Sequence, residues 1–257
     1  MTLSFVAILV GITLVILFNK YIQRNNKLLA SKLEGDLENK RRIQMMELKA
    51  LRSQMNPHFV HNSLNAIQYF IQRNEVELSE TYLVKFSKLI RLFFEYSRRQ
   101  TITVTQEVEL LNNYLQIEQL RFEDKLNYTI RVDSMIESDQ QTLPSMILQP
   151  MVENAVNHGL FHKKGSGKIR IQFIYVNEFT IKVQIADDGI GINKSIEMYR
   201  SSTQKYKSHS SAVLHERLEL LNESKKWSIS YSIQDLSEIR NTSGTIVTLT
   251  INQHDEL

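Results

Sequence analysis

The sequence has no cysteine, only three prolines and only eight glycines in 257 residues. The absence of cysteine excludes disulfides, cysteine-ligated zinc sites and thiol nucleophiles. Scarce proline and glycine favour long helices, so each glycine that is present carries more information. Positive and negative residues are nearly balanced, with 31 Lys and Arg and 28 Asp and Glu. A net charge of +3 does not indicate a nucleic-acid-binding protein, and we expect no direct contact with nucleic acid.

The first 22 residues differ in character from the rest of the chain. No residue from Leu3 to Phe18 is charged, and with its flanks this apolar run approaches the ~20 residues that span a bilayer. Basic residues follow the run, at Lys20 and Arg24, but none precedes it. The positive-inside bias therefore predicts a single-pass anchor at residues 1–22 in the inner or plasma membrane, with the remainder in the cytoplasm. A cleaved signal peptide is the alternative, but it needs a basic start and a small-x-small cleavage site, which the sequence lacks.

Residues 23–55 are polar and charged, with apolar residues at irregular steps of three and four. This pattern predicts a helical linker, either a poor coiled coil or an amphipathic segment without a partner. Further helices are predicted at residues 56–73, 77–97 and 105–123, and their apolar stripes indicate a helical bundle.

The helix predicted at residues 56–73 has two contrasting sides at 100° per residue. The expected dry stripe consists of Val60, Leu64, Ile67 and Ile71. The expected wet side carries histidines and amides, namely Gln54, His58, His61, Asn62 and Asn65.

The periodicity changes in the second half of the chain. Apolar and polar residues alternate at about 169–175, 179–185, 227–233 and 245–251, which predicts half-buried strands. Asn177-Glu178 is the expected hairpin connection between the first two strands. Helical stretches at about 143–160 and 212–224 are interleaved with the strands. A mostly antiparallel sheet with helices on one face gives a two-layer α/β sandwich.

The predicted fold class is therefore α+β, with an N-terminal transmembrane helix, a helical bundle and a C-terminal sandwich. We divide the chain into an anchor, a linker, a bundle and a sandwich domain. Their expected bounds are residues 1–22, 23–55, 56–125 and 126–257.

The segment LQPMVENAVNHG, residues 148–159, carries Glu153, Asn154, Asn157 and His158 on adjacent helical turns. A buried Asn or Glu is costly unless it is paired. An Asn oxygen that faces a cavity is a candidate ligand for Mg²⁺, which prefers oxygen donors and shares its shell with phosphates. Helix capping or a core hydrogen bond is the alternative that this segment alone leaves open.

The segment ADDGIG, residues 186–191, ends one of the alternating strands. Asp187 closes the strand, and Gly189 and Gly191 let the backbone approach a flat ligand closely. The segment fits neither a Walker loop nor a dinucleotide fingerprint, and taken alone it is also compatible with an ordinary turn. Gly244 and Thr245 lead into the last strand through what is by itself a hairpin turn.

The order of these segments narrows the interpretation. A helix with Glu-Asn, a hairpin, a DxGxG turn, a further helix and a Gly-Thr pair together resemble the GHKL-type ATPase fold of histidine kinases, DNA gyrase and MutL. The segment QMNPHFVHNSLN, residues 54–65, resembles the phosphoacceptor motif of the LytS/YehU-type sensor kinases. A second segment of that family, Y-L-x-I-E-x-x-R-F, is matched by Tyr114, Leu115, Ile117, Glu118, Arg121 and Phe122. The resemblance covers about residues 50–252.

The resemblance implies a membrane-anchored sensor histidine kinase of a two-component system. Such a protein uses ATP and Mg²⁺ to phosphorylate itself and passes the phosphoryl group to an aspartate of a response regulator. His58 would be the phosphoacceptor, and we hypothesise that Asn62 orients its ring. Asn154 would hold the Mg²⁺ that bridges the phosphates. The nucleotide-binding residues near it would be Glu153, Asn157 and His158.

The remaining roles concern the adenine side of the nucleotide and the partners. Asp187 would accept a hydrogen bond from the adenine amino group. Gly189 and Gly191 would shape the floor of the pocket, and Gly244 and Thr245 would close it. The bundle predicts a homodimer, because a second copy would cover its apolar stripes. The family suggests a response regulator of the LytTR type.

Two features depart from the family pattern. His61 stands where relatives usually carry an apolar aromatic residue, and it is either a rival acceptor or a tolerated surface change. The glycine-rich segment before the next helix is missing, since residues 205–222 read KYKSHSSAVLHERLELLN. Ser208, Ser210 and Ser211 are candidates for holding the phosphates instead.

Two other functions compete with a kinase. Hydrolysing ATPases of the gyrase kind place a Glu four residues before the metal-binding Asn, but here that position is Pro150, which cannot accept a proton. A pseudokinase scaffold with a degraded lid would dimerise and couple a signal without transferring phosphate. Incubation with labelled ATP separates the three classes. Labelled protein indicates a kinase, free phosphate without labelled protein indicates a hydrolysing ATPase, and neither product indicates a scaffold.

Overall fold

The computed structural model describes residues 57–123, 125–201, 209–239 and 242–254, and eight residues between 20 and 32. The chain divides into two compact units, Met1–Lys49 and Ala50–Leu257. The described residues of the first unit are helical, while most of the predicted anchor at residues 1–22 and most of the predicted linker lie outside the described residues. Within the described part of the chain, no helix combines the length and the apolar composition needed to cross a membrane.

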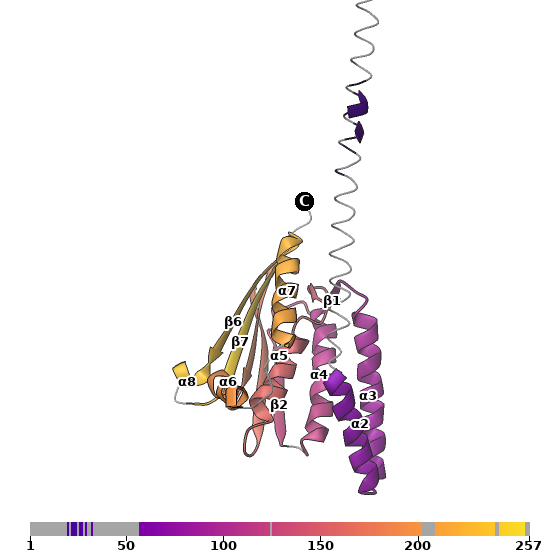
Figure 1. The fold of residues 1–257 in the computed structure, drawn as a ribbon, viewed down its shortest axis with the longest axis vertical. Coiled ribbons are helices and arrows are strands. Elements are labelled where there is room, and N and C mark those ends of the chain that lie inside the picture. The colour runs from indigo at the N-terminus through magenta and orange to yellow at the C-terminus, as the bar shows by residue number, and fades with distance from the viewer. Residues whose placement is uncertain are drawn as a thin grey trace, which may run out of the picture. The chain divides into compact units, whose positions relative to one another are not determined.

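Three helices form a bundle in the second unit. They are α2 (Pro57–Gln72), α3 (Val76–Tyr96) and α4 (Val104–Arg121), as Figure 1 shows. A capping box opens α4, in which the Thr103 hydroxyl accepts the Gln106 N–H at 3.2 Å and the Thr103 N–H donates to Gln106 Oε1 at 3.0 Å. All three helices lie within two residues of their predicted bounds, so the predicted bundle helices are confirmed.

The buried side of α2 differs from the predicted stripe. Leu64 and Ile71 are 54% and 60% exposed. The buried side chains are instead Phe59, Ser63, Ala66 and Phe70. The stripe is thus rotated by roughly 90° around the helix axis, at 100° per residue. Large aromatic rings gain most from burial, and the Phe59 ring packs 5.3 Å from that of Tyr114 on α4.

A five-stranded sheet follows the bundle, with the strand order β2-β4-β5-β7-β6. Its strands are β2 (Leu126–Val132), β4 (Gly167–Asn177), β5 (Thr180–Asp187), β6 (Trp227–Asp235) and β7 (Thr245–Gln253). β2 runs parallel to β4, and the other pairs are antiparallel. The four predicted strands are confirmed, whereas β2 was not predicted. A separate antiparallel pair is formed by β1 (Thr101–Thr103) and β3 (Thr142–Pro144).

The hairpin between β4 and β5 is shifted by one residue from its predicted position. Asn177 pairs with Thr180, so the two loop residues are Glu178 and Phe179. The side-chain oxygen of Asn177 accepts the Phe179 N–H at 3.0 Å. Asn177 therefore stabilises the turn from the strand that precedes it.

Helices cover one face of this sheet, which confirms the predicted two-layer arrangement. They are α5 (Gln149–Asn154), the π-helical η1 (Ala155–Leu160) and α7 (His209–Glu223), accompanied by α6 (Ile192–Ser201) and the short α8 (Leu236–Ile239). α4 contacts both α3 and β2 and thus lies between the bundle and the sheet (Figure 1). The predicted helix at 143–160 begins only at Gln149, because residues 142–144 pair with β1 and Met146 has a φ of 57°.

Glu107 and Arg217 tie the bundle to the sandwich. The buried carboxylate of Glu107 on α4 accepts the N–H groups of Met146 at 3.2 Å and Leu148 at 3.0 Å. Arg217 on α7 donates to the carbonyl oxygens of Ser145 and, at 3.1 Å, Met146. Burial raises the pKa of Glu107 to about 7, although the two N–H groups and Arg217 oppose the shift. These bonds fix the segment that leads into α5.

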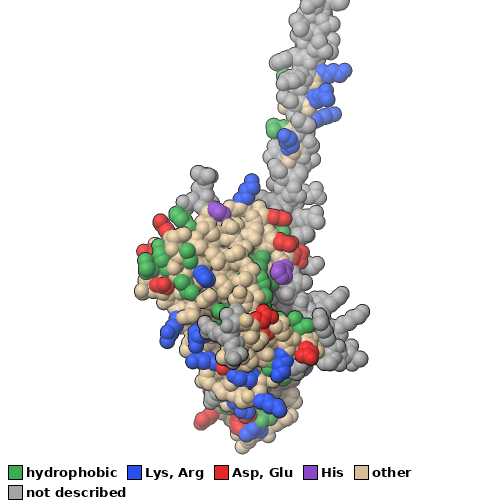
Figure 2. Space-filling model, turned by 90° about the vertical axis from the view of Figure 1, so that its left-hand side faces the viewer, with side chains coloured by type: hydrophobic (Ala, Val, Ile, Leu, Met, Phe, Trp, Pro, Cys, Tyr) green, Lys and Arg blue, Asp and Glu red, His purple; other side chains and the backbone are tan. Residues whose placement is uncertain are grey.

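The surface combines charged residues of both signs with large apolar side chains on two bundle helices. On the face seen in Figure 2, Lys and Arg side chains are interspersed with Asp and Glu side chains. Large apolar side chains on α2 and α3 are between 49% and 69% exposed, namely Leu64, Ile71, Leu83, Val84 and Phe94. Exposed apolar side chains that gather on neighbouring helices mark an interaction surface.

Candidate functional site

The candidate site forms where η1 meets the loop that follows β5. The Ile190 N–H donates to the Gly159 oxygen at 3.1 Å. A Cβ added to Gly189 would collide with the backbone of Gly159, and one added to Gly159 would lie 2.7 Å from Asp187 Oδ1. Only glycine allows two backbones to approach this closely. The polar helix around residues 149–160 and the DxGxG turn are therefore neighbours in space.

Asp187 is the buried carboxylate at this junction. Its side chain is 5% exposed, and its Oδ1 accepts the Gly189 N–H at 2.9 Å. Burial raises the pKa of Asp187 to about 7; the Gly189 and Thr245 N–H groups oppose this, while Asp188 and Asp235 add to it. A buried carboxylate with a strongly shifted pKa is a candidate functional group.

Strand β7 begins between two strands that each end in an aspartate. Thr245 pairs with Asp187 of β5 on one side and with Asp235 of β6 on the other. Gly244 has a φ of 134°, and a Cβ there would collide with the Asp187 carbonyl oxygen. The predicted residues Gly244 and Thr245 are thus brought next to Asp187.

Asp235 was not among the predicted site residues. Its buried carboxylate accepts the Asn193 N–H at 3.0 Å, the Ser237 N–H at 2.9 Å and the Ser237 hydroxyl at 2.7 Å. Burial raises the pKa of Asp235, but these bonds outweigh it and leave the pKa below its usual value. A Cβ on Gly191, whose φ is 85°, would lie 2.7 Å from this carboxylate. An Asp at the end of an alternating strand, as at Asp187, is the sequence signal that would have found it.

The predicted polar residues of α5 and η1 have different surroundings. Glu153, 9% exposed, accepts the Gln149 Nε2–H at 3.2 Å and interacts electrostatically with Tyr114 of the bundle. Asn154 ends α5 and is half-buried. Asn157 and His158 are also half-buried and line a cavity of about 740 Å³. Irregular π-helical turns such as η1 occur frequently at functional sites.

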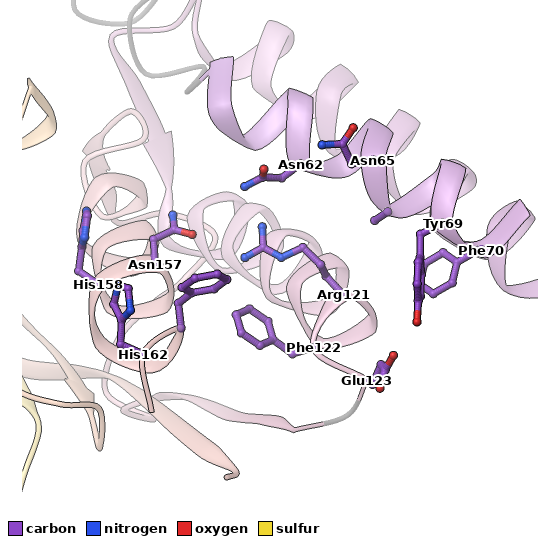
Figure 3. Close-up of a pocket in the computed structure, with 12 residues that line it drawn as sticks. Asn62, Asn65, Tyr69, Phe70, Arg121, Phe122, Glu123, Asn157, His158 and His162 are labelled. Atoms are coloured by element: carbon purple, nitrogen blue, oxygen red, sulfur yellow. The ribbon is translucent and has the colours of Figure 1, made fainter. Parts of the chain in front are cut away.

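The cavity lies between α2, the end of α4 and η1. Its polar lining includes Asn62, Asn65, Arg121, Asn157 and His158. Figure 3 shows the side chains of Asn62, Arg121 and Asn157 directed toward the same space from three different elements. The cavity therefore lies between α2, the helix that carries His58, and η1, which directly follows Asn154 in the chain.

His58 itself lies in α2, four residues before Asn62. Residues four apart lie on the same face of a helix. The side chain of His58 and those of residues 209–213 lie outside the described set, as does the segment 202–208. The predicted roles of His58 and of Ser208, Ser210 and Ser211 thus stay predictions. His61 is exposed, and its Nδ1 lies 3.1 Å from Asn65 Nδ2.

The junction has features that fit a nucleotide and a divalent cation. The buried Asp187 offers an acceptor for a ligand N–H, and the half-buried Asn154 offers an amide oxygen. Among the described residues, no three His, Asp or Glu side chains gather in a way that could hold a metal ion. Mg²⁺ at Asn154 would complete its shell with phosphate oxygens and water.

Replacing Gly189 by Ala is expected to force η1 away from the β5 loop. The added methyl collides with the Gly159 backbone, which cannot move aside as a side chain would. We expect the free energy of unfolding to fall by about 3 kcal/mol, the cost of overpacking a tight contact. Urea denaturation followed by circular dichroism measures this loss.

Gly165→Ala is the matched control for this change. Gly165 has a φ of 96°, and nothing lies within 4 Å of an added Cβ, so only the backbone cost of about 1 kcal/mol applies. Equal losses in the two variants would show that the contact with Gly159 contributes nothing.

Comparisons with known proteins match the chain to one family. Residues 46–126 match the family described as histidine kinase. The chain is 32% identical over 176 residues to the sensor histidine kinase YpdA of Escherichia coli, and this match covers 68% of this chain and 30% of YpdA. It is 32% identical over 179 residues to the sensor protein LytS of Bacillus subtilis, covering 70% of this chain and 28% of LytS.

The chain thus spans less than a third of the length of either relative. Among solved structures, it is similar to the histidine kinase domain of the blue-light activated kinase EL346 of Erythrobacter litoralis. The TM-score is 0.45 at 13% identity, and the match covers 82% of this chain and 94% of that domain.

Proposed function

We propose that this chain, a homologue of the LytS-type sensor histidine kinases, is a membrane-anchored kinase that transfers a phosphoryl group from ATP to its own His58. One observation carries the proposal. The contact of Gly159 with Gly189 brings η1 against the loop that follows Asp187. The same η1 shares a cavity with α2, the helix on which His58 lies. The expected nucleotide-binding segments and the expected acceptor helix thus meet at η1.

ATP is proposed to bind against η1 and the β5 loop. The Asp187 carboxylate accepts the adenine amino hydrogen, which replaces the hydration that burial has removed. Asn154 contributes an oxygen ligand to Mg²⁺, which supplies neutralisation of the phosphate charge when it is bound. Asn157 and His158, on the wall of the cavity, contact the phosphates. Glu153 supports the helix through Gln149.

The neutral imidazole of His58 is the nucleophile. One ring nitrogen attacks the γ-phosphorus, a nitrogen–phosphorus bond forms, and the bond from phosphorus to the β,γ-bridging oxygen breaks. ADP leaves with that electron pair, and the proton on the other ring nitrogen is released to solvent. An unperturbed imidazole with a pKa near 6.5 is mostly neutral in the cytoplasm. Asn62, one turn along α2, is proposed to orient the ring for attack.

A second copy of the chain is the proposed partner of the bundle. The exposed apolar side chains on α2 and α3 would be covered in a four-helix arrangement with the same helices of the other protomer. The phosphoryl group would then pass to an aspartate of a response regulator, for which the LytTR type is expected. Residues 1–22 would hold this assembly at the membrane.

Incubation of the full chain with γ-labelled ATP and Mg²⁺ in detergent micelles tests the proposal. We expect protein label that is lost in acid, is stable in alkali and maps to His58 by peptide mass spectrometry. Free phosphate without protein label would indicate a hydrolysing ATPase, and neither product would indicate a scaffold. Either of these two results would overturn the kinase proposal.

A further inference from the structure

The cavity between α2 and η1 contains a half-buried cation to which the proposed reaction gives no role. Arg121, at the end of α4, lines this cavity together with Phe122. Both close the Y-L-x-I-E-x-x-R-F segment. The earlier residues of the segment are buried and at most 1% exposed, namely Tyr114, Leu115, Ile117 and Glu118. The segment is therefore divided into a part that packs in the core and a part that faces the cavity.

Arg121 is held in place by groups that are themselves fixed. Its Nη2 lies 2.7 Å from Oε2 of Glu118, whose side chain is 1% exposed, while that of Arg121 is 16% exposed. The guanidinium carbon also lies 5.0 Å from the centre of the Phe122 ring. A guanidinium carries five N–H donors in a planar fork, and the ion pair with Glu118 engages one of its nitrogens. The side chain is thus anchored without using its full capacity as a donor.

The other walls of the cavity place Arg121 between the two expected reactants. Asn62 comes from α2, one turn after His58, and Asn157 and His158 come from η1. Figure 3 shows the Arg121 guanidinium directed into the space that Asn62 and Asn157 share. The acidic residue on this lining, Glu123, is exposed at the rim, where its carboxylate lies 3.9 Å from Arg73.

From this geometry we infer that Arg121 binds the oxygens of the phosphoryl group while it passes from ATP to His58. This inference rests on the function proposed above. A guanidinium matches two phosphate oxygens in a bidentate geometry. In phosphoryl transfer the charge is spread over the three equatorial oxygens, so a fixed cation beside them stabilises the transition state more than bound ATP.

A purely structural role for Arg121, as the partner of Glu118, leads to a different expectation. Removing the guanidinium alone leaves a buried carboxylate without its cation, which is destabilising. Replacing both residues by Gln removes the charge from both and leaves two neutral amides in place of the ion pair. If the role were structural, this double variant would recover both stability and phosphorylation.

The test is the rate of His58 labelling by the full chain in a single turnover. We expect Arg121→Gln to lower this rate by about 100-fold or more, the effect of removing a transition-state donor. ATP affinity, measured with a fluorescent analogue, should change by less than about threefold, because ground-state binding depends on other groups. Arg121→Lys should recover part of the rate, since it restores the charge without the fork.

The double variant Glu118→Gln/Arg121→Gln decides between the two roles. We expect it to melt near the wild-type temperature and to label His58 as slowly as Arg121→Gln. Arg170→Gln, an exposed arginine on β4, is the matched control and should keep the wild-type rate. A folded double variant that labels His58 within about threefold of the wild-type rate would overturn the inference.

A binding measurement keeps the inference testable if the wild-type chain takes no label. The full chain is treated with phenylglyoxal, and the modification of each arginine is followed by mass spectrometry with and without millimolar inorganic phosphate at constant ionic strength. Phosphate should slow the modification of Arg121 several-fold and leave Arg170 unchanged. Protection without labelling would reject the proposed kinase function but keep the phosphate site. Equal modification of Arg121 with and without phosphate would reject the site.

Discussion

His58→Gln is expected to abolish the acid-labile label, with a loss of at least about 1,000-fold. The Gln side chain is polar and close to His in size, but its amide nitrogen is not a nucleophile, so no bond to phosphorus can form. ATP binding should stay within about threefold of wild type, because position 58 lies on α2 and the nucleotide is proposed to bind η1 and the β5 loop. The measurement is protein-bound label after a timed reaction with labelled ATP and Mg²⁺.

His61→Gln is the matched control for this experiment. His61 lies in the same helix, is exposed, and has its Nδ1 3.1 Å from the side-chain nitrogen of Asn65. It lies three residues from position 58 and is not the proposed acceptor. We therefore expect His61→Gln to take at least about half as much label as wild type. Label that persists in His58→Gln and disappears in His61→Gln would move the acceptor to position 61.

The regular parts of the fold were predictable because they follow from local periodicity. The three bundle helices and the strands β4, β5, β6 and β7 each have a pattern of period 3.6 or 2 that a single segment contains. The side on which α2 is buried was not predictable in this way. Phe59 and Phe70 compete with the aliphatic stripe at Leu64 and Ile71, and the choice depends on Tyr82 and Tyr114, which belong to other helices.

The connections between segments distant in sequence were not predictable from local patterns. Glu107 accepts two N–H groups from residues near 147, and Arg217 reaches the same turn from α7. Neither residue has a sequence pattern that marks its partner. The parallel edge strand β2 depends in the same way on β4, about 40 residues further along the chain.

The predicted role of the glycines in nucleotide binding stays a prediction, but the structure gives a different reason for glycine at these positions. Gly189 was expected to admit a flat ligand, yet a Cβ there would already collide with Gly159 in the absence of any ligand. Gly191 is constrained by the Asp235 carboxylate and Gly244 by the Asp187 oxygen. Contacts within the chain therefore require these glycines, and they hold together the segments from which the proposed nucleotide site is built.

Asp187→Asn is expected to have opposite effects on ligand binding and on stability. The change keeps the size of the side chain and an oxygen that can accept the Gly189 N–H, which donates to Asp187 Oδ1 at 2.9 Å. Above about pH 7, where Asp187 is ionised, it removes the charged acceptor for the adenine amino group. We expect nucleotide affinity to fall by about 100-fold, which corresponds to the loss of a hydrogen bond to a buried charged group. Titration with a fluorescent ATP analogue measures the loss.

Asp188→Asn is the matched control, since it removes the same charge at the neighbouring position. The Asp188 side chain is 47% exposed and pairs with Lys163 at 2.8 Å on the surface. A surface pair contributes little, so nucleotide affinity should change by less than about threefold. An Asp187→Asn variant that binds ATP as tightly as Asp188→Asn does would remove Asp187 from the proposed site.

The effect on stability follows from the pKa of Asp187, which burial raises from 3.8 to about 7. Between these two values the folded protein retains a proton that the unfolded chain has released, so this group makes the free energy of unfolding fall as the pH rises. Asn does not titrate, so this group causes no fall in the free energy of unfolding of the variant. The difference in the free energy of unfolding between Asp187→Asn and wild type should therefore shift in favour of the variant by roughly 2–3 kcal/mol from about pH 5 to about pH 8.5. Urea denaturation at both pH values checks the gain, and a difference that does not grow with pH would show that Asp187 is ionised in the folded chain without cost. A carboxylate that lowers stability and yet is needed for binding is kept for its ligand, so both results together would support its proposed contact with adenine.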